Sequence, residues 1–274
     1  MPGIAVELGA GIRRIVAPNA GLMTGPGTNT YLLGERTVTV LDPGPDDEDH
    51  LQAILRAAGG NIRSIVVTHT HRDHSPLAAR LAQRTKARVI GLPAPGDGRQ
   101  DENFSPDHSP RDGERITLGE VALTAIHTPG HASNCVCYLH EEARLLFTGD
   151  HVLEGVSPVI LAPDGDMSAY IGSLDKLAFH DFERIAPGHG GLIEDAKNGV
   201  AMLRAHRLAR EAKVLAALVR GGRATIEQLT PAVYDDVPAE RHSWAQLTLQ
   251  AHLLKLAREG RVAETGGCWQ VSAE

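Results

Sequence analysis

Short apolar stretches rich in β-branched residues recur along the chain before residue 200. Residues 62–68 form the clearest of them, and this run predicts a buried strand. The segment that follows, residues 76–84, predicts a helix with Ser75 as its cap and Pro76 at its first position. Further strands are expected at residues 121–126, 144–148 and 182–186, each followed by a turn that contains glycine.

The segments between these strands predict a hairpin, two helices and a loop. Residues 1–33 predict two strands joined by the Gly- and Pro-rich loop of residues 21–29. Helices are expected over residues 50–58, ended by Gly59, and over residues 166–179. Residues 93–113 are rich in Pro, Gly, Asp and Ser, so they predict a surface loop with His108 exposed and not a ligand.

After residue 199 the pattern changes to amphipathic helices. These are predicted over residues 200–219, from Thr225 with a capping box, and over residues 243–259, followed by a two-stranded wing at residues 261–264 and 266–271.

Three helices and a hairpin make a winged helix, so we expect one domain at residues 1–199 and a winged-helix-like domain at residues 200–274. The third helix of this second domain offers few basic residues for phosphate contact. We therefore expect the domain to wall one side of a pocket or to form a homodimer surface, and fold alone does not decide between these roles.

Composition restricts the location of the protein. With 274 residues, 42% of them hydrophobic, the chain can bury a large core. No apolar stretch approaches the ~20 residues of a membrane span, and the N-terminus lacks the basic and apolar parts of a secretory signal. We expect a cytoplasmic protein without a membrane partner, in which Cys135, Cys137 and Cys268 are reduced thiols.

Net charge bears on nucleic-acid binding. The formal net charge is −7 and the isoelectric point is near 6.0, so the molecule as a whole does not attract RNA or DNA. A local basic groove could form from Arg204, Arg207, Arg210, Lys213, Arg220 and Arg223. Charges spaced along a helix are more often a solvated face, which is the interpretation we favour.

The densest group of chemically active residues is His69, His71, Asp73 and His74. They follow the strand predicted at residues 62–68, on the turn before the next helix. Three imidazoles and a carboxylate within six residues cannot all be buried on one helix or strand face, which indicates a metal site. A mixed His and Asp set favours zinc over calcium or magnesium.

Three further ligand types, His131, Asp150 and His189, follow the other predicted strands. Each comes directly after a small or Gly-containing turn, which lets the backbone approach the site closely. Five histidines and two aspartates exceed the four ligands of a closed zinc site, so two adjacent metals are the simplest account. Any one histidine could instead be an ordinary buried residue, but the motif and the turns are independent signals.

This set resembles the metallo-β-lactamase superfamily, whose HxHxDH motif stands here as His69-x-His71-x-Asp73-His74, followed by His131, Asp150 and His189 in the family's order. By this resemblance, His69, His71 and His131 would hold one zinc; Asp73, His74 and His189 would hold the second; and Asp150 would bridge both.

The same resemblance implies the cofactor and the fold. The cofactor would be two Zn²⁺ per chain, with iron or manganese as alternatives. The fold would be α/β, a four-layer αβ/βα sandwich with the site along one edge of its two sheets, here followed by the small C-terminal winged helix. The tip of the N-terminal hairpin would overhang that edge.

A finer resemblance concerns residues 19–34, residues 38–44 and the tail after residue 200. These look like the β-lactamase-like protein 2 group, which includes an endoribonuclease acting on single-stranded RNA. Cys135 departs from the pattern, since relatives often have a second His there; we expect a residue beside the site or a small buried thiol. A Tyr occurs on the corresponding helix of the group, so Tyr170 would contact substrate, with packing as the alternative.

These residues predict a metal-dependent hydrolase that uses a metal-bridging hydroxide, with Asp73 and Tyr170 as the catalytic side chains. Asp73 can orient the attacking water as well as ligate. A phosphodiesterase or endoribonuclease acting on single-stranded RNA is expected first, because of the resemblance. The alternative is a glyoxalase II-like thioesterase or lactonase acting on a small-molecule ester or thioester, which the acidic charge favours. A non-catalytic regulator is disfavoured by the complete ligand set.

Overall fold

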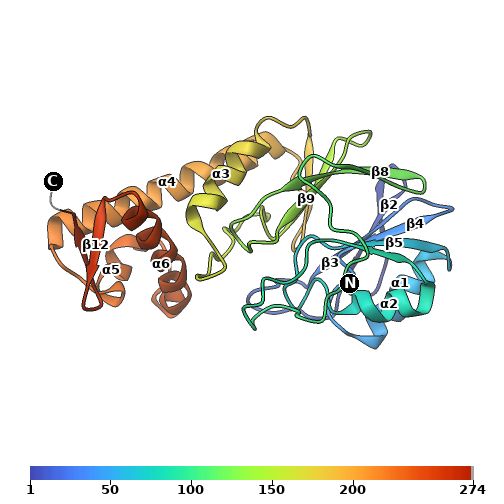
Figure 1. The fold of residues 1–274 in the computed structure, drawn as a ribbon, viewed down its shortest axis with the longest axis horizontal. Coiled ribbons are helices and arrows are strands. Elements are labelled where there is room, and N and C mark those ends of the chain that lie inside the picture. Colours follow the sequence, from blue (N-terminus) through green and yellow to red (C-terminus); the bar gives the residue numbers. More distant parts are fainter. Residues whose placement is uncertain (273–274) are drawn as a thin grey trace.

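Two β-sheets face each other and carry helices on their outer sides in the computed structural model, which describes residues 1–272 (Figure 1). The first sheet contains, in spatial order, β1 (Val6–Gly9), β2 (Ile12–Val16), β3 (Asn29–Leu33), β4 (Val38–Leu41), β5 (Ile62–Val66) and β6 (Arg88–Ile90). The second contains β11 (Arg184–Pro187), β10 (Leu145–Gly149), β9 (Val136–His140), β8 (Val121–His127) and β7 (Arg115–Leu118).

Two helices make the parallel crossovers of the first sheet. Strands β4, β5 and β6 are parallel, and parallel strands need a crossover connection, which α1 (Glu48–Ala58) and α2 (Leu77–Thr85) supply. The Asp47 side chain caps α1 by accepting from the backbone N–H of His50, and Gly59 ends the helix with a φ of 64°. The end of this helix was predicted correctly.

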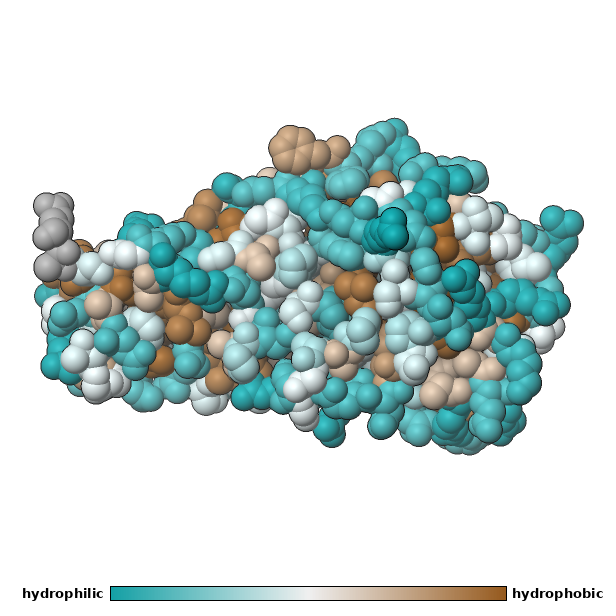
Figure 2. Space-filling model, viewed as in Figure 1, coloured by the Kyte–Doolittle hydropathy of each residue, from teal (hydrophilic) through white to brown (hydrophobic). Residues whose placement is uncertain are grey.

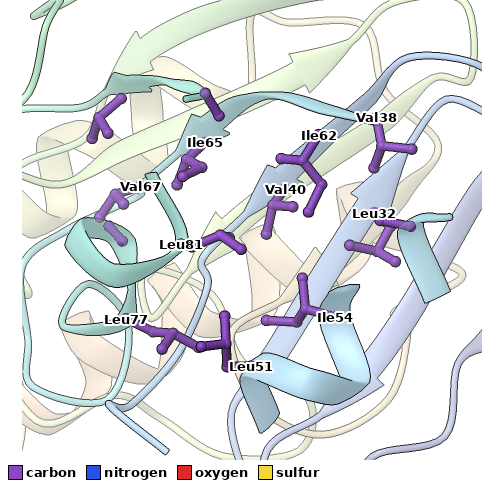
Figure 3. Packing of buried hydrophobic residues seen from close by; sticks show 14 of the residues in the cluster. Leu32, Val38, Val40, Leu51, Ile54, Ile62, Ile65, Val67, Leu77 and Leu81 are labelled. Carbon is purple, nitrogen blue, oxygen red and sulfur yellow. The ribbon is translucent and has the colours of Figure 1, made fainter. Parts of the chain in front are cut away.

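Three hydrophobic clusters separate the four layers. One lies between the first sheet and α1 and α2 (Figure 3), and a second lies between the two sheets, where the rings of Tyr31 and Phe147 meet edge to face with centroids 5.0 Å apart. The third packs the second sheet against α3 (Met167–Leu177) and the start of α4 (Ala196–Gly221). Alternation along β3 serves two of these clusters, because Leu32 faces the helices whereas Tyr31 faces the other sheet. The predicted αβ/βα sandwich is confirmed.

The C-terminal part has a fourth core of its own. It contains the end of α4, α5 (Ile226–Val233), a 3-10 turn (Ala239–Arg241), α6 (His242–Arg258) and the hairpin of β12 (Val262–Thr265) and β13 (Cys268–Val271). The capping box at Thr225 is present, and the predicted winged helix is confirmed. Figure 1 shows α4 running from the region of α3 to this group. Residue 199 lies inside α4, so the division into residues 1–199 and 200–274 stays a prediction.

Three local predictions were wrong. Residues 1–33 form three strands, because Ala10 and Gly11, both at positive φ, turn the chain between β1 and β2. Ser75 does not cap α2; its hydroxyl donates to Asp101 Oδ2 at 2.8 Å and Pro76 occupies the capping position. His108 is half-buried, with Nε2 2.7 Å from a Glu114 carboxylate oxygen.

Hydrophilic residues cover most of the face seen in Figure 2, with smaller hydrophobic areas between them. Within residues 1–272, no helix combines the length and the apolar character that crossing a bilayer requires.

Candidate metal centre

The turn after β5 carries the four clustered candidates, and Asp42 holds it in place. Asp42 follows β4, the parallel neighbour of β5, so its side chain reaches the start of the turn. Its carboxylate accepts hydrogen bonds from the backbone N–H and the hydroxyl of Thr68, both at 2.7 Å, and from Nδ1 of His74 at 3.0 Å. Because Nδ1 of His74 donates to this carboxylate, Nε2 is the nitrogen that points into the site, where it could bind a metal ion once it is deprotonated.

Three other turns bring His131, Asp150 and His189 to the same edge. Strands β8 and β10 are both antiparallel to β9, and β10 is parallel to β11, so the carboxyl ends of β8, β10 and β11 lie on one side. Gly188 permits the close approach, because a Cβ there would lie 2.5 Å from Asp150 Oδ1. Gly149, at a φ of 49°, would bring a Cβ to 2.4 Å from the Thr68 hydroxyl.

A first group consists of His69, His71 and His131. Nδ1 of His71 lies 3.0 Å from Nε2 of His69 and 3.0 Å from Nε2 of His131. The opposite nitrogens are held by oxygen atoms, Nδ1 of His131 by the Val159 carbonyl at 2.8 Å and Nδ1 of His69 by the Thr68 hydroxyl at 3.0 Å. Thr68 already donates to Asp42, so it accepts from His69. Three nitrogen lone pairs thus converge on one point.

A second group consists of Asp73, His74, His189 and Asp150. Nε2 of His189 lies 3.2 Å from Asp73 Oδ2 and 3.2 Å from Asp150 Oδ1. Nε2 of His74 lies 3.3 and 3.4 Å from the same two oxygens. The other oxygen of Asp150, Oδ2, lies 3.7 Å from Nε2 of His131 in the first group. Asp150 therefore stands between the groups with one oxygen toward each.

Burial and charge act differently on the two groups. Burial, reinforced by the neighbouring imidazoles, lowers the pKa of His71 to about 3, and burial also lowers the pKa of His131. In the second group burial alone would lower the pKa of His189, but Asp150 and Asp73 outweigh it and raise the pKa to about 10. Burial would raise the pKa of Asp150, yet His189 and His74 hold it well below its usual range. The metal-free second group is thus a set of ion pairs beside three neutral imidazoles.

The donor set fits divalent metal ions. Two buried atoms at its centre, Nε2 of His74 and Oδ1 of Asp150, have no hydrogen-bond partner among the described residues. They lie 3.4 Å apart as an ion pair without a well-formed hydrogen bond, and a bound cation would give both atoms a ligand bond. Three sets of possible ligand atoms lie within 4.8 Å of one another: His69, His71 and His131; His69, His74 and Asp150; and Asp73, His74 and His189.

A cavity of about 170 Å³ opens onto both groups. Its floor includes His71, Asp73, His131, Asp150 and His189. Its walls come from four segments that are distant in sequence: Met23 and Thr24 of the N-terminal loop, Asp97 and Arg99 of the loop over residues 93–113, Val159, Leu161 and Asp164 before α3, and Trp244 and Leu247 of α6. The C-terminal domain thus walls one side of the cavity, as expected.

Two residues singled out in the sequence lie elsewhere. Tyr170 is fully buried outside the cavity lining; its hydroxyl donates to the His151 carbonyl at 2.7 Å and the Arg207 guanidinium lies 5.2 Å from its ring centre. This position fits the packing alternative, and the contact of Tyr170 with substrate stays an untested prediction. Cys135 is a buried thiol whose pKa burial raises well above the usual value.

The basic side chains of α4, and Arg223 just after it, are mostly engaged within the molecule. Arg207 and Arg210 are buried, and Arg210 pairs with Asp236 at 2.6 Å. Arg204 pairs with Asp175, Lys213 with Asp235, and Arg223 donates to the Thr265 carbonyl, while Arg220 is exposed. An open basic groove does not form from this set, and the solvated helix face is also wrong for Arg207 and Arg210.

Family models match two regions of the chain: the metallo-beta-lactamase superfamily over residues 23–189 and the beta-lactamase associated winged helix domain over residues 225–269. The chain is 29% identical to the Beta-lactamase-like protein 2 homolog of Caenorhabditis elegans, over 93% of this chain and 87% of the relative. It is 31% identical to the Atrochrysone carboxyl ACP thioesterase of Aspergillus chevalieri, over 91% of this chain and 82% of the relative.

Among solved structures, a metallo-beta-lactamase family protein from Thermus thermophilus matches with a TM-score of 0.80 and 25% identity, covering 97% of this chain and 100% of that chain. The superfamily match spans all seven candidate ligands, from His69 to His189. With its sandwich fold, its His and Asp cluster and these relatives, the chain is a hydrolase that belongs to the metallo-beta-lactamase superfamily.

Proposed function

We propose that the chain is a binuclear zinc hydrolase that cleaves thioesters and related small-molecule esters. One ion would be held by His69, His71 and His131 and the other by Asp73, His74 and His189, with Asp150 shared between them. Support comes from the two convergent groups and from the unpartnered buried atoms at their centre. The His and Asp composition favours zinc among divalent ions.

When bound, a pair of divalent ions supplies hydroxide near neutral pH and polarises the bond to be cleaved. The protein's own part is orientation. The Thr28 hydroxyl donates to Asp73 Oδ2 at 2.9 Å, which fixes that carboxylate at the cavity floor, where it would orient the attacking water. In the overall reaction water adds its oxygen to the thioester carbonyl carbon, the C–S bond breaks, and a carboxylic acid and a thiol leave.

The polarity and charge of the cavity walls are the basis for choosing between the two substrate classes. Met23, Leu161 and Trp244 are apolar, Asp97 and Asp164 are acidic, and Arg99 contributes a positive charge. Binding of an RNA backbone relies on several Lys and Arg contacts to phosphates, whereas most of the α4 cations are buried or paired with acids. We therefore rank thioester cleavage above RNA cleavage, which reverses the order expected from the sequence.

Cleavage of single-stranded RNA is the second candidate. The similarity to a protein named Beta-lactamase-like protein 2 homolog favours it, and Arg99 at the cavity would be the first phosphate contact to test. The similarity to a protein named as an ACP thioesterase, at comparable identity and coverage, favours the first candidate.

Two measurements test the proposal. Elemental analysis of protein produced with zinc should approach two equivalents per chain; a reproducible single equivalent, unchanged in His189→Ala, contradicts the binuclear assignment. Turnover of acyl thioesters, a lactone and labelled single-stranded RNA should then be compared across a salt series. Thioester turnover that salt hardly affects supports the proposal, whereas RNA cleavage that falls steeply with salt, beside intact thioester, reverses the ranking.

A further inference from the structure

Large apolar side chains that reach solvent gather at the mouth of the metal-site cavity. Met23, Leu161 and Trp244 expose 48%, 36% and 41% of their surface, and Val159 and Leu247 beside them are half-buried. Apolar side chains left in water forfeit the free energy of burial, and their clustering round a cavity marks a binding surface. These five residues are called the apolar wall below.

Helix α6 presents its part of the wall on one face. Leu247 and Thr248 follow Trp244 by three and four positions, so both lie beside it on the helix surface. The Thr248 hydroxyl accepts from the backbone N–H of Ile160 at 3.4 Å, which ties this face to the segment that carries Val159 and Leu161.

Helix α4 and the metal site hold the same segment. The Arg207 guanidinium donates to the Pro158 carbonyl, and the next carbonyl, that of Val159, accepts from Nδ1 of His131 at 2.8 Å. The segment that carries Val159 and Leu161 is therefore anchored on one side to the C-terminal helices and on the other to a candidate ligand, which fixes this part of the apolar wall relative to the metal groups.

The polar atoms near the wall are largely satisfied within the protein. Asp164 Oδ2 accepts from Gln100 Nε2 at 2.8 Å and from the backbone N–H of Ser133 at 3.0 Å, and Arg99 donates to the Ala162 carbonyl at 3.0 Å. A polar acyl group would lose its hydration there without gaining matched partners, whereas an apolar one gains burial.

We infer that the apolar wall is the acyl-binding site, in which Trp244 and Leu247 of the C-terminal domain select substrates with an apolar acyl group. This inference rests on the proposed thioester hydrolysis and adds to it the class of acyl group and the residues that recognise it. Trp244 and Leu247 are specificity residues in this scheme, since they contact the acyl group at a distance from the bond that breaks.

The test uses the zinc-loaded full chain and N-acetylcysteamine thioesters with acetyl, butyryl, hexanoyl and octanoyl groups. In the wild type kcat/KM should rise by up to about fourfold per added methylene until the wall is covered, because each buried methylene favours binding. Trp244→Ala and Leu247→Ala should flatten this rise, because they should lower the octanoyl kcat/KM by a larger factor than the acetyl kcat/KM. Trp244→Leu, which keeps an apolar side chain, should give an intermediate slope.

Phe179→Ala is the matched control, because Phe179 is an apolar residue that is 89% exposed and lies outside the cavity lining. It should keep the wild-type length dependence. Circular dichroism and zinc content confirm that each variant is folded and loaded. A wild type without length dependence, or a Trp244→Ala variant that keeps the full slope, overturns the inference while leaving thioester hydrolysis intact.

A binding measurement separates the inference from the proposed function. The uncleavable thioether N-acetyl-S-octylcysteamine should bind the zinc-loaded protein more tightly than its ethyl analogue, and Trp244→Ala should remove that difference. If no thioester is cleaved but this pattern appears, thioester hydrolysis fails and the apolar-group site stands. If thioesters are cleaved and both thioethers bind equally, the inference fails.

Discussion

Replacing Asp42 by Asn is expected to weaken metal binding while the protein stays folded. Asn has nearly the same size and tolerates the left-handed conformation of this position, where φ is 49°. Its amide oxygen can still accept from the Thr68 backbone N–H, but its NH₂ group then faces Nδ1 of His74. Since both would be donors, His74 must carry its proton on Nε2, the atom that points into the second group.

The magnitude follows from the bonds that change. Asp42 accepts three hydrogen bonds, and the variant loses the two charge-assisted ones from the Thr68 hydroxyl and from His74. Hydrogen bonds to charged groups contribute about 1.5–3 kcal/mol each, and a rotated Thr68 hydroxyl can recover part by accepting from the amide, so the metal-free protein should lose on the order of 2 kcal/mol of stability. Loss of such an orienting partner weakens metal affinity about 10–100-fold.

Zinc titration in competition with a chromogenic chelator measures the affinity, and thermal unfolding of the metal-free protein measures the stability. Asp112→Asn is the matched control, because Asp112 pairs with Lys176 at 2.8 Å on the surface, and its loss should leave the zinc titration unchanged. If folded Asp42→Asn protein binds two equivalents of zinc as tightly as the wild type, the orienting role of Asp42 is refuted.

Three further outcomes are expected. Although burial alone would lower it, the carboxylates of Asp150 and Asp73 raise the pKa of His189 from 6.5 to about 10; these ion pairs therefore stabilise the metal-free protein fully below about pH 6.5 and are lost toward pH 10. Zinc binding should release a proton across that window, which calorimetry in buffers of different ionisation enthalpy detects; a heat independent of the buffer contradicts this. Asp150→Ala should lose zinc and activity together, whereas Tyr170→Phe should keep both and lose about 1 kcal/mol of stability, so equal losses in the two variants would contradict the geometry. Arg207→Lys should weaken zinc binding through the Pro158 segment and His131, and a zinc titration equal to the wild type's would show that Arg207 only packs.

The sequence singled out the residues that the structure brings together at this edge because their signals are local. His69, His71 and His74 are set by spacing within one turn, and the glycine turns before Asp150 and His189 are visible without knowing the fold. Asp42 was not among the residues singled out for the site, although a carboxylate directly after a buried strand was available as a signal. The role of Asp42 depends on the parallel pairing of β4 with β5, and a local sequence pattern does not predict which strands pair.

Tyr170 and the arginines of α4 show more clearly what cannot be predicted from the sequence pattern alone. Periodicity indicates that a helix has two faces, but it does not say which neighbours each face meets. Helix α4 contributes to two cores, with Val200 beside α3 and Val214 in the winged helix, so its side chains between them lie at a junction. There Arg207 donates to the Pro158 carbonyl and Arg210 to the Val233 carbonyl. A long guanidinium side chain can make such bonds while its methylene groups are buried.

The hydrogen bonds of Arg207 and Arg210 form a polar junction between the two cores. This junction gives the winged helix a role beside the candidate metal site that does not require exposed basic residues. Apolar contacts alone allow two cores to slide against each other, whereas hydrogen bonds to defined carbonyls specify one arrangement. The Arg207 bond to Pro158 and the Thr248 bond to Ile160 flank the carbonyl that orients His131. The same contacts set the distance from Trp244 to the metal groups. The position of the proposed acyl-binding wall and the orientation of His131 therefore depend on the same hydrogen bonds. Variants that loosen the junction should therefore change acyl-length preference and zinc affinity together, while variants of Trp244 change the first alone.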